Sequence, residues 1–301
     1  MQNRTDTLPA IGRTITFLLA PTGAHLTWGS IGAALCGAVA SNGWQWQGER
    51  LLALLQVLFL VEGLWSTWRA LLIDIDWQGL AQTYPLPPQS GNLPAWPYLT
   101  PWSPLGQIIA RWGRLRRWAC EILPPNQGNA LMTLPYLPAI ILIVSALLGH
   151  AYLLLSSLVI ALTIIEWFIA RRQPWHKSMQ AIVQIALSWI AGHLVFAPLT
   201  TSSLTLACAY ALSYQGALYL HDERCTAQEY PWALGLLFGG QIFVAGALAG
   251  HDLLIAVLLG LLLSPQLALV PHLAPSAAPG RYLRHLAPFV SVAMLVAAWA
   301  I

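Results

Sequence analysis

The sequence predicts an all-α integral membrane protein with about nine transmembrane helices, arranged as two four-helix halves plus one. The 301-residue chain is 57% hydrophobic and only 8% charged, whereas a soluble domain carries about 25% charged residues. So few charges cannot cover a water-facing surface, but lipid accepts apolar side chains on the outside of a protein. The apolar residues gather in stretches long enough to cross a bilayer as helices. Alternate loops between these stretches carry the basic residues, which is typical of a chain that crosses repeatedly.

Two short turns divide the apolar stretches into helical hairpins. They lie at Gly149-His150 and Gly250-His251, where neighbouring stretches follow each other closely. The segments 145–150 and 246–251 are similar, which suggests two related four-helix halves, although apolar sequences also match by chance. The nine predicted spans lie near 15–41, 51–75, 131–149, 151–170, 178–197, 201–220, 231–250, 252–271 and 284–301.

The charges in the loops predict the orientation of the chain. When the N-terminus is placed on the cytoplasmic side, only Arg50 falls in an outer loop, and Arg69 lies near the inner end of the second span. Cytoplasmic loops of membrane proteins are rich in Lys and Arg, so we expect an inner (cytoplasmic) membrane protein with a cytoplasmic N-terminus. The basic residues expected on the inner side are Arg4, Arg13, Arg111, Arg114, Arg116, Arg117, Arg171, Arg172, Lys177, Arg224, Arg281 and Arg284.

One long loop, 77–130, interrupts an otherwise single transmembrane domain over 1–301. Its first half is rich in proline, and its second half predicts a helix over 105–122 with several arginines flanked by Trp112 and Trp118. A basic helix with aromatic residues is typical of the membrane interface. We therefore expect it on the cytoplasmic leaflet; the alternative is a soluble helix that packs on the protein.

Charge and cysteine content exclude two classes of function. The net charge of +3 comes from scattered residues, so no basic face is dense enough to bind nucleic acid. The four cysteines are isolated and have no zinc-site spacing. The expected partners are membrane lipid or an isoprenoid. If the chain is a subunit of a membrane complex, its partners also include other membrane subunits.

Two acidic pairs lie at the inner ends of predicted spans. Asp74 and Asp76 end the second span, and Asp222 and Glu223 follow the sixth. Carboxylates that face each other at a membrane mouth can hold Mg²⁺, which prefers oxygen ligands and bridges to phosphates. The alternative is ordinary charge at helix ends.

Three charged residues spaced by seven lie along one face of the second span. They are Glu62, Arg69 and Asp76, and a carboxylate such as Glu62 inside a span is costly unless it faces a partner or a cavity. Trp65 precedes Arg69 by one turn and could stack on it. This stripe predicts a polar cavity; the alternatives are a structural ion pair or a protonated Glu62 that packs against a neighbouring helix. His193 is the deepest histidine and is either a cavity residue or hydrogen-bonded packing.

Several short motifs resemble the UbiA-type intramembrane prenyltransferase superfamily. Trp68 to Asp76 aligns with the family's N-D-x-x-D-x-x-x-D, and Leu86 to Gly91 is similar to the R-P-L-P-x-G that follows it. Leu18 to His25 resembles the Arg-Pro opening of the first span, and Glu166 to Lys177 followed by Gly192 resembles the family's aromatic-basic-Gly pattern. The resemblance implies nine spans in two four-helix halves, with acidic motifs on the cytoplasmic side after the second and sixth spans.

The metal-binding motifs depart from the family pattern. Trp68 stands at the asparagine, Arg69 at the first aspartate and Leu72 at the second, so only Asp76 remains, with Asp74 beside it. By resemblance, Mg²⁺ would lie on Asp74, Asp76, Asp222 and Glu223. The phosphate-binding residues would be Arg69, Arg171, Arg172 and Lys177, and Glu62, Trp65 and His193 would line the cavity.

The resemblance implies transfer of an isoprenoid from its diphosphate to an aromatic or tetrapyrrole acceptor. The lost aspartates favour an alternative, a catalytically inactive UbiA-like scaffold. Such a scaffold would bind lipid, quinone or pigment as a subunit or assembly factor of a membrane complex. A transporter is a third class, because Glu62 is a charge near the midplane, but the sequence has no evident paired half-helices.

Overall fold

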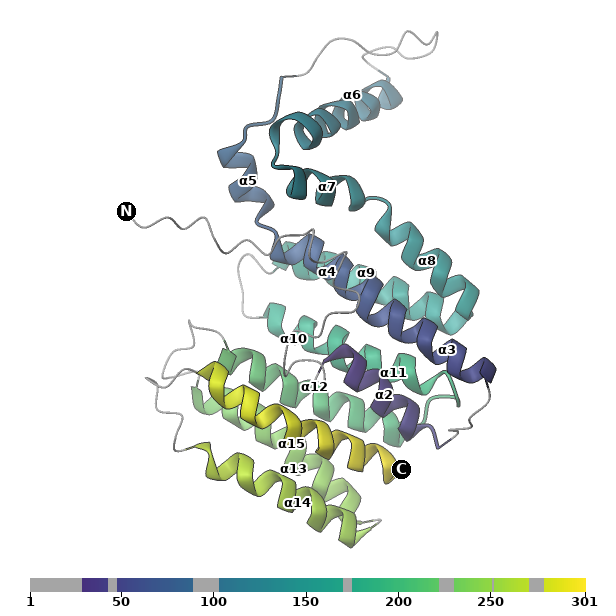
Figure 1. The fold of residues 1–301 in the computed structure, drawn as a ribbon, viewed down its shortest axis with the longest axis vertical. Helices are drawn as coiled ribbons and strands as arrows, with labels where there is room; N and C mark the ends of the chain where they lie inside the picture. Colours follow the sequence, from purple (N-terminus) through teal and green to yellow (C-terminus); the bar gives the residue numbers. More distant parts are fainter. Residues whose placement is uncertain are drawn as a thin grey trace. The chain divides into compact units, whose positions relative to one another are not determined.

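The fold is described from a computed structural model of the chain. The structure describes residues 29–42, 48–88, 103–169, 175–221, 230–250, 252–270 and 279–301. All regular elements within these ranges are helical, with several π-helical segments, labelled η, inside longer helices (Figure 1). The predicted all-α class is therefore confirmed for the part of the chain that is described.

The chain divides into two compact units. The loop unit comprises Met1–Leu19 and Thr67–Ile140, and the bundle unit comprises Ala20–Ser66 and Ile141–Ile301. Helix α4 (Ser66–Arg69) and helix α8 (Leu137–Leu148) continue from one unit into the other. The bundle unit also contains α2 (Ser30–Ala40), α3 (Gly48–Leu58), η3 (Phe59–Trp65), α9 (His150–Ile169), α10 (Trp175–Ala181), η6 (Ile182–Leu187), α11 (Ser188–His193), α12 (Thr201–His221), α13 (Tyr230–Ala249), α14 (Leu253–Ala268) and α15 (Pro279–Trp299).

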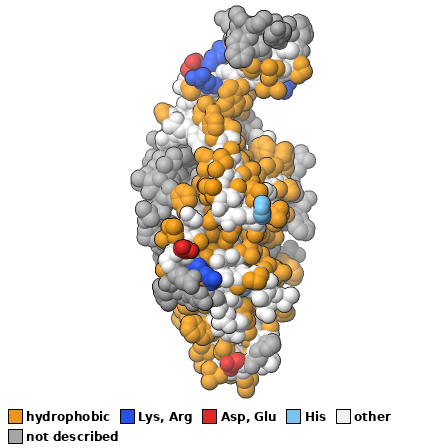
Figure 2. All heavy atoms as spheres, turned by 90° about the vertical axis from the view of Figure 1, so that its right-hand side faces the viewer, with side chains coloured by type: hydrophobic (Ala, Val, Ile, Leu, Met, Phe, Trp, Pro, Cys, Tyr) orange, Lys and Arg blue, Asp and Glu red, His pale blue; other side chains and the backbone are white. Residues whose placement is uncertain are grey.

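Three described helices are long and apolar enough to cross a membrane. They are Gly48–Asp74 with 27 residues, His150–Phe168 with 19 and Tyr230–Ala249 with 20. A bent pair, Pro125–Thr133 and Leu137–Leu148, makes a fourth if it is one span. Each of the nine predicted spans overlaps a helix, but fewer than nine meet this criterion. Hydrophobic side chains cover much of the face in Figure 2, as is compatible with membrane insertion.

The bent pair has a clear cause in the sequence. α7 (Pro125–Thr133) and α8 meet at an angle of 47°, and Pro135 lies in the break. Proline lacks the N–H that would continue the helical hydrogen bonds, and its ring clashes with the preceding turn. The predicted third span, 131–149, therefore crosses a bend, and α7 begins inside the segment predicted as loop.

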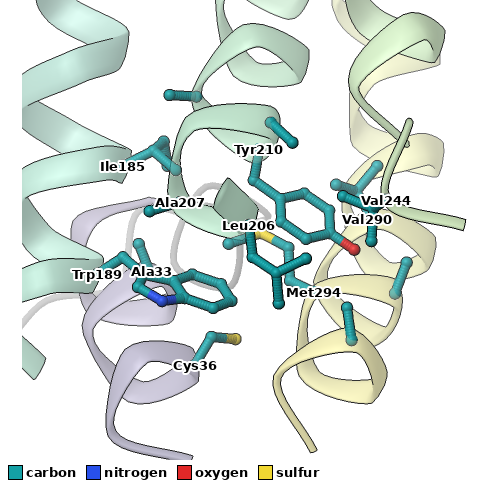
Figure 3. Close-up of a cluster of buried hydrophobic side chains, with 14 of the residues drawn as sticks. Ala33, Cys36, Ile185, Trp189, Leu206, Ala207, Tyr210, Val244, Val290 and Met294 are labelled. Atoms are coloured by element: carbon teal, nitrogen blue, oxygen red, sulfur yellow. The ribbon is translucent and has the colours of Figure 1, made fainter. Parts of the chain in front are cut away.

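The core of the bundle unit forms around an aromatic pair. The rings of Trp189 and Tyr210 stack with centroids 6.0 Å apart and an angle of 18° between their planes. Side chains from α2, α13 and α15 surround this pair, including Cys36, Val244 and Met294 (Figure 3). Aromatic pairs of this kind contribute packing energy beyond the area they bury. The core therefore joins the first and last described helices of the bundle to α11 and α12.

Hydrogen bonds inside the loop unit hold its basic helix to the start of its proline-rich segment. The elements of the loop unit are η4 (Ala70–Asp74), α5 (Trp77–Thr83), α6 (Pro104–Arg117), η5 (Trp118–Ile122) and α7. Nε of Arg114 donates to the carbonyl oxygen of Pro87 at 2.6 Å, and Nε1 of Trp118 donates to that of Tyr84 at 2.8 Å. The basic helix expected over 105–122 is thus present as α6 and η5, and residues of α6–η5 hold the backbone of 84–87.

Candidate functional site

Glu62 is an exposed carboxylate near the middle of the apolar helix Gly48–Asp74. It lies in the π-helical segment η3, and its described hydrogen-bond partner is the side chain of Ser30 at the start of α2. π-Helical turns inside α-helices occur frequently at functional sites. An exposed carboxylate within an apolar span is costly in lipid, so its position favours a ligand, a water-filled space or a partner group over lipid contact.

Trp65 follows Glu62 on η3 but is buried, with 1% of its surface exposed. Its Nε1 donates to Oγ of Ser156 on α9 at 3.0 Å. The hydroxyl of Ser156 in turn hydrogen-bonds that of Ser145 on α8. This chain ties η3 to the α8–α9 hairpin, and Trp65 lies within the packing of the bundle unit.

Arg69 and Asp74 are the predicted site residues that the structure brings together. A guanidinium nitrogen of Arg69 lies 4.0 Å from a carboxylate oxygen of Asp74, and the exposed fractions of the two side chains are 8% and 56%. Asp76 makes a different contact: its Oδ1 accepts the backbone N–H of Gly79 at 3.0 Å and caps α5. An N-cap aspartate satisfies a donor at the helix start, so both carboxylates have structural partners.

The described carboxylates do not by themselves form a Mg²⁺ site. No group of three His, Cys, Asp or Glu side chains comes together in the ranges that the structure describes. Mg²⁺ prefers several oxygen ligands in near-octahedral geometry, and the Asp74 carboxylate faces Arg69 instead. Asp222 and Glu223, and the phosphate candidates Arg171 and Arg172, lie outside the described residues.

His193 is fully buried and both of its ring nitrogens have partners. Nδ1 lies 3.0 Å from Oγ of Ser203, and Nε2 lies 3.1 Å from the carbonyl oxygen of Pro198. Ser203 Oγ also accepts Nε1 of Trp189 at 2.9 Å. Because the Pro198 carbonyl can only accept, Nε2 donates to it, and the Ser203 hydroxyl can donate its hydrogen to Nδ1. His193 therefore holds the turn after α11 to the start of α12.

A group of polar side chains lies between α10–η6 and α12. The ammonium group of Lys177 lies 4.5 Å from the centre of the Tyr219 ring. Further along, the hydroxyl of Tyr214 donates to Oε1 of Gln184 at 2.8 Å. The side chains of Gln180, Gln215 and Ser178 complete this set.

Sequence reasoning singled out only Lys177 from this arrangement. It weighed charged residues and histidines and passed over uncharged amides. Gln180 and Gln184 are four residues apart, which places them on one face of a helix. The sequence does contain a signal for this polar group. Two amides lie on one face of an otherwise apolar stretch, and Tyr214-Gln215 lie in the next stretch.

Comparison with known proteins gives one short similarity. A 55-residue segment is 38% identical to the bacteriochlorophyll synthase 34 kDa chain of Chloroflexus aurantiacus, and it covers 18% of each chain. The chain therefore matches less than a fifth of the length of that relative. No protein-family model and no solved structure matches the chain. The chain is thus an all-α protein with membrane-compatible helices, partly similar in sequence to a bacteriochlorophyll synthase chain.

Proposed function

We propose that this chain is a divergent UbiA-like membrane protein that transfers an isoprenoid from its diphosphate to a tetrapyrrole or other aromatic acceptor. In this reaction the bond between the first prenyl carbon and a diphosphate oxygen breaks and diphosphate leaves with the bonding electrons. The prenyl carbon then bonds to the acceptor, either at a carboxylate oxygen or at a ring carbon that loses its proton. The observation that carries the proposal is the 55-residue similarity to a bacteriochlorophyll synthase chain. Bacteriochlorophyll is a tetrapyrrole with an isoprenoid tail, so this similarity favours a tetrapyrrole acceptor.

The proposal assigns the charged residues at the inner helix ends to the diphosphate. Lys177 is a mostly buried cation beside Tyr219, and Arg69 is a buried cation that faces Asp74; together with Arg171 and Arg172 they would meet phosphate oxygens. The proposal includes a Mg²⁺ requirement, and the ion would depend on Asp222 and Glu223 in addition to Asp74 and Asp76. The proposal also includes nine membrane spans, with the 77–130 loop on the cytoplasmic side.

A transfer assay with paired aspartate variants tests this function. Purified protein in nanodiscs would be given geranylgeranyl diphosphate, bacteriochlorophyllide and Mg²⁺, and the prenylated product measured by chromatography. We expect product from the wild type and none from Asp76→Ala/Asp222→Ala. Asp252→Ala is the matched control, because Asp252 also caps a helix through its side chain, at Leu254 and Ile255 of α14. Full turnover by the double variant would contradict the assignment.

A second candidate is a catalytically inactive scaffold that binds lipid, quinone or pigment within a membrane complex. The observation that favours it is the engagement of Asp74 with Arg69 and of Asp76 with the start of α5. An arginine at the position of a metal-binding aspartate neutralises the neighbouring carboxylate. The two candidates separate on purification from native membranes. Co-migration with other membrane subunits and no turnover by the wild type favours the scaffold.

A further inference from the structure

Two side chains contact the oxygen of the Gln184 amide. Its Oε1 accepts the Tyr214 hydroxyl at 2.8 Å and Nε2 of Gln180 at 3.2 Å. With its oxygen held by these two contacts, the amide has its NH₂ group, with two hydrogens, at the other end. Within the described ranges, this NH₂ group has no hydrogen-bond acceptor, and Gln184 is only half-buried.

A second amide nearby leaves two more polar atoms without partners. Nε2 of Gln215 donates to Oγ of Ser178 at 2.7 Å. Because Ser178 accepts in this bond, its hydroxyl hydrogen remains available as a donor. Among the residues that the structure covers, neither this hydrogen nor Oε1 of Gln215 has a partner. We call Ser178, Gln184, Tyr214 and Gln215 the amide patch; all four are half-buried.

The neighbouring helix α13 indicates the depth of the amide patch in the membrane. Gly216, next to Gln215, lies against the backbone of Ala233 and Leu237 on α13, so close that a Cβ atom would not fit. Figure 1 shows α12 and α13 side by side. Ala233 and Leu237 lie in the first turns of α13, which is one of the helices apolar enough to cross a membrane. The patch therefore lies level with the N-terminal part of this apolar helix.

The chemistry of the patch favours an uncharged ligand. Its available groups are an amide NH₂, a hydroxyl hydrogen and an amide oxygen, and none carries a charge. The nearest described cation along α10 is Lys177, whose ammonium group already lies over the Tyr219 ring. Amide and hydroxyl donors pair well with carbonyl oxygens, which need no counter-charge.

We infer that the amide patch binds an uncharged ligand with carbonyl oxygens, to which Gln184 and Ser178 each donate a hydrogen bond. A quinone of the kind dissolved in membranes has this chemistry. The site requires only α10, η6 and α12, so it goes beyond the proposed transfer reaction and does not depend on it.

A quinone titration tests the inference. The full chain in nanodiscs would be titrated with decylubiquinone, without prenyl diphosphate or Mg²⁺, and the saturable part of tryptophan quenching recorded. We expect saturable binding by the wild type and a Kd that is roughly three- to tenfold weaker for Gln184→Glu, the loss typical of one hydrogen bond. This variant keeps oxygens for Tyr214 and Gln180 but removes the NH₂ group. Ser178→Ala should weaken binding similarly.

Ser157→Ala is the matched control for the loss of a hydroxyl. Ser157 is exposed, and its Oγ donates to Leu153 within its own helix at 2.8 Å, so its Kd should equal that of the wild type. Thermal unfolding of each variant checks that it is folded. Saturable wild-type binding that both patch variants retain would overturn the inference, and so would quinone uptake that is only non-saturable partition into lipid. A failed transfer assay would leave this result unaffected.

Discussion

Two glycines set the distance between α2 and α11. A Cβ atom at Gly192 would collide with the carbonyl of Ala34, and one at Gly37 would collide with the carbonyl of Trp189. Small residues at such crossings let helix backbones approach closely, which favours packing of helices in membranes. The crossing positions Trp189 against α2, and therefore the aromatic core beside it.

A single methyl group at this crossing should therefore destabilise the bundle unit. We expect Gly192→Ala to lower the free energy of unfolding by about 1–3 kcal/mol, the usual cost of overpacking a core. Gly235→Ala on α13 is the control, because nothing lies near a Cβ atom there and alanine favours helix by about 0.5–1 kcal/mol. Thermal unfolding in detergent measures both variants. Equal melting temperatures for them would contradict the close crossing.

At the residue scale, the sequence could identify polar residues whose burial in an apolar stretch costs free energy, but it could not identify their partners. Glu62 and His193 stand out because polar groups are rare in apolar stretches, and both were predicted as site candidates. Whether His193 contacts Ser203 or a ligand depends on tertiary packing, which a single sequence does not encode visibly. The sequence analysis does not single out Gln184, because an uncharged amide is less conspicuous than a charge. Burying an amide nevertheless also costs free energy unless it has a hydrogen-bond partner.

Helix α6 is the element whose surface points most clearly to the membrane. Its exposed apolar residues are Leu105, Ile108, Trp112 and Leu115, whose spacing places them on one side of the helix. Arg111 and Arg116 are also exposed. Basic amphipathic helices can lie in the membrane interface with their apolar side among the acyl chains, and we predict this location for α6.

Single-cysteine labelling tests where α6 lies. An NBD dye at Ile108→Cys, in a chain whose native cysteines are replaced, should show blue-shifted emission and be quenched by lipid-attached quenchers. The same dye at Gln107→Cys, an exposed neighbour about 100° around the helix, should stay in water. Anionic lipid should increase the difference, because arginines attract anionic headgroups. Equal water exposure at the two positions would refute the interfacial location.

Helix positions were predictable to the extent that they depend on hydropathy. Every predicted span overlaps a helix, because apolar stretches of this length need backbone hydrogen bonds within the segment. The π-helical segments η3 and η6 were not predictable, since an extra residue in a turn leaves no compositional mark. The bend at Pro135 was visible in the sequence, but the apolar stretch across it suggested one straight span.

At the scale of the whole molecule, the number of spans determines on which side the C-terminus lies. Nine spans from a cytoplasmic N-terminus place Ile301 outside, and this count puts twelve of the 14 Lys and Arg residues on the inner side. The span count depends most on the bent α7–α8 pair, because neither helix alone is long enough to cross the membrane and the two count as one span only when taken together. If this pair does not cross, every later loop changes side.

Topology reporters decide this point. Alkaline phosphatase fused after Ile301 should be active, because it folds only outside the cytoplasm, whereas green fluorescent protein at the same position should be dark. Truncated fusions after Asn42 and after Arg117 provide the outer and inner controls, since they precede α7. The positive-inside pattern requires the Arg117 fusion to be fluorescent. A fluorescent fusion at Ile301 with correct controls would mean an even number of spans. A fluorescent fusion after His150, with correct controls, would place the missing crossing at the α7–α8 pair. Arg171, Arg172 and Lys177 would then lie on the outer side, away from any cytoplasmic diphosphate, which would remove the phosphate-binding role proposed for them.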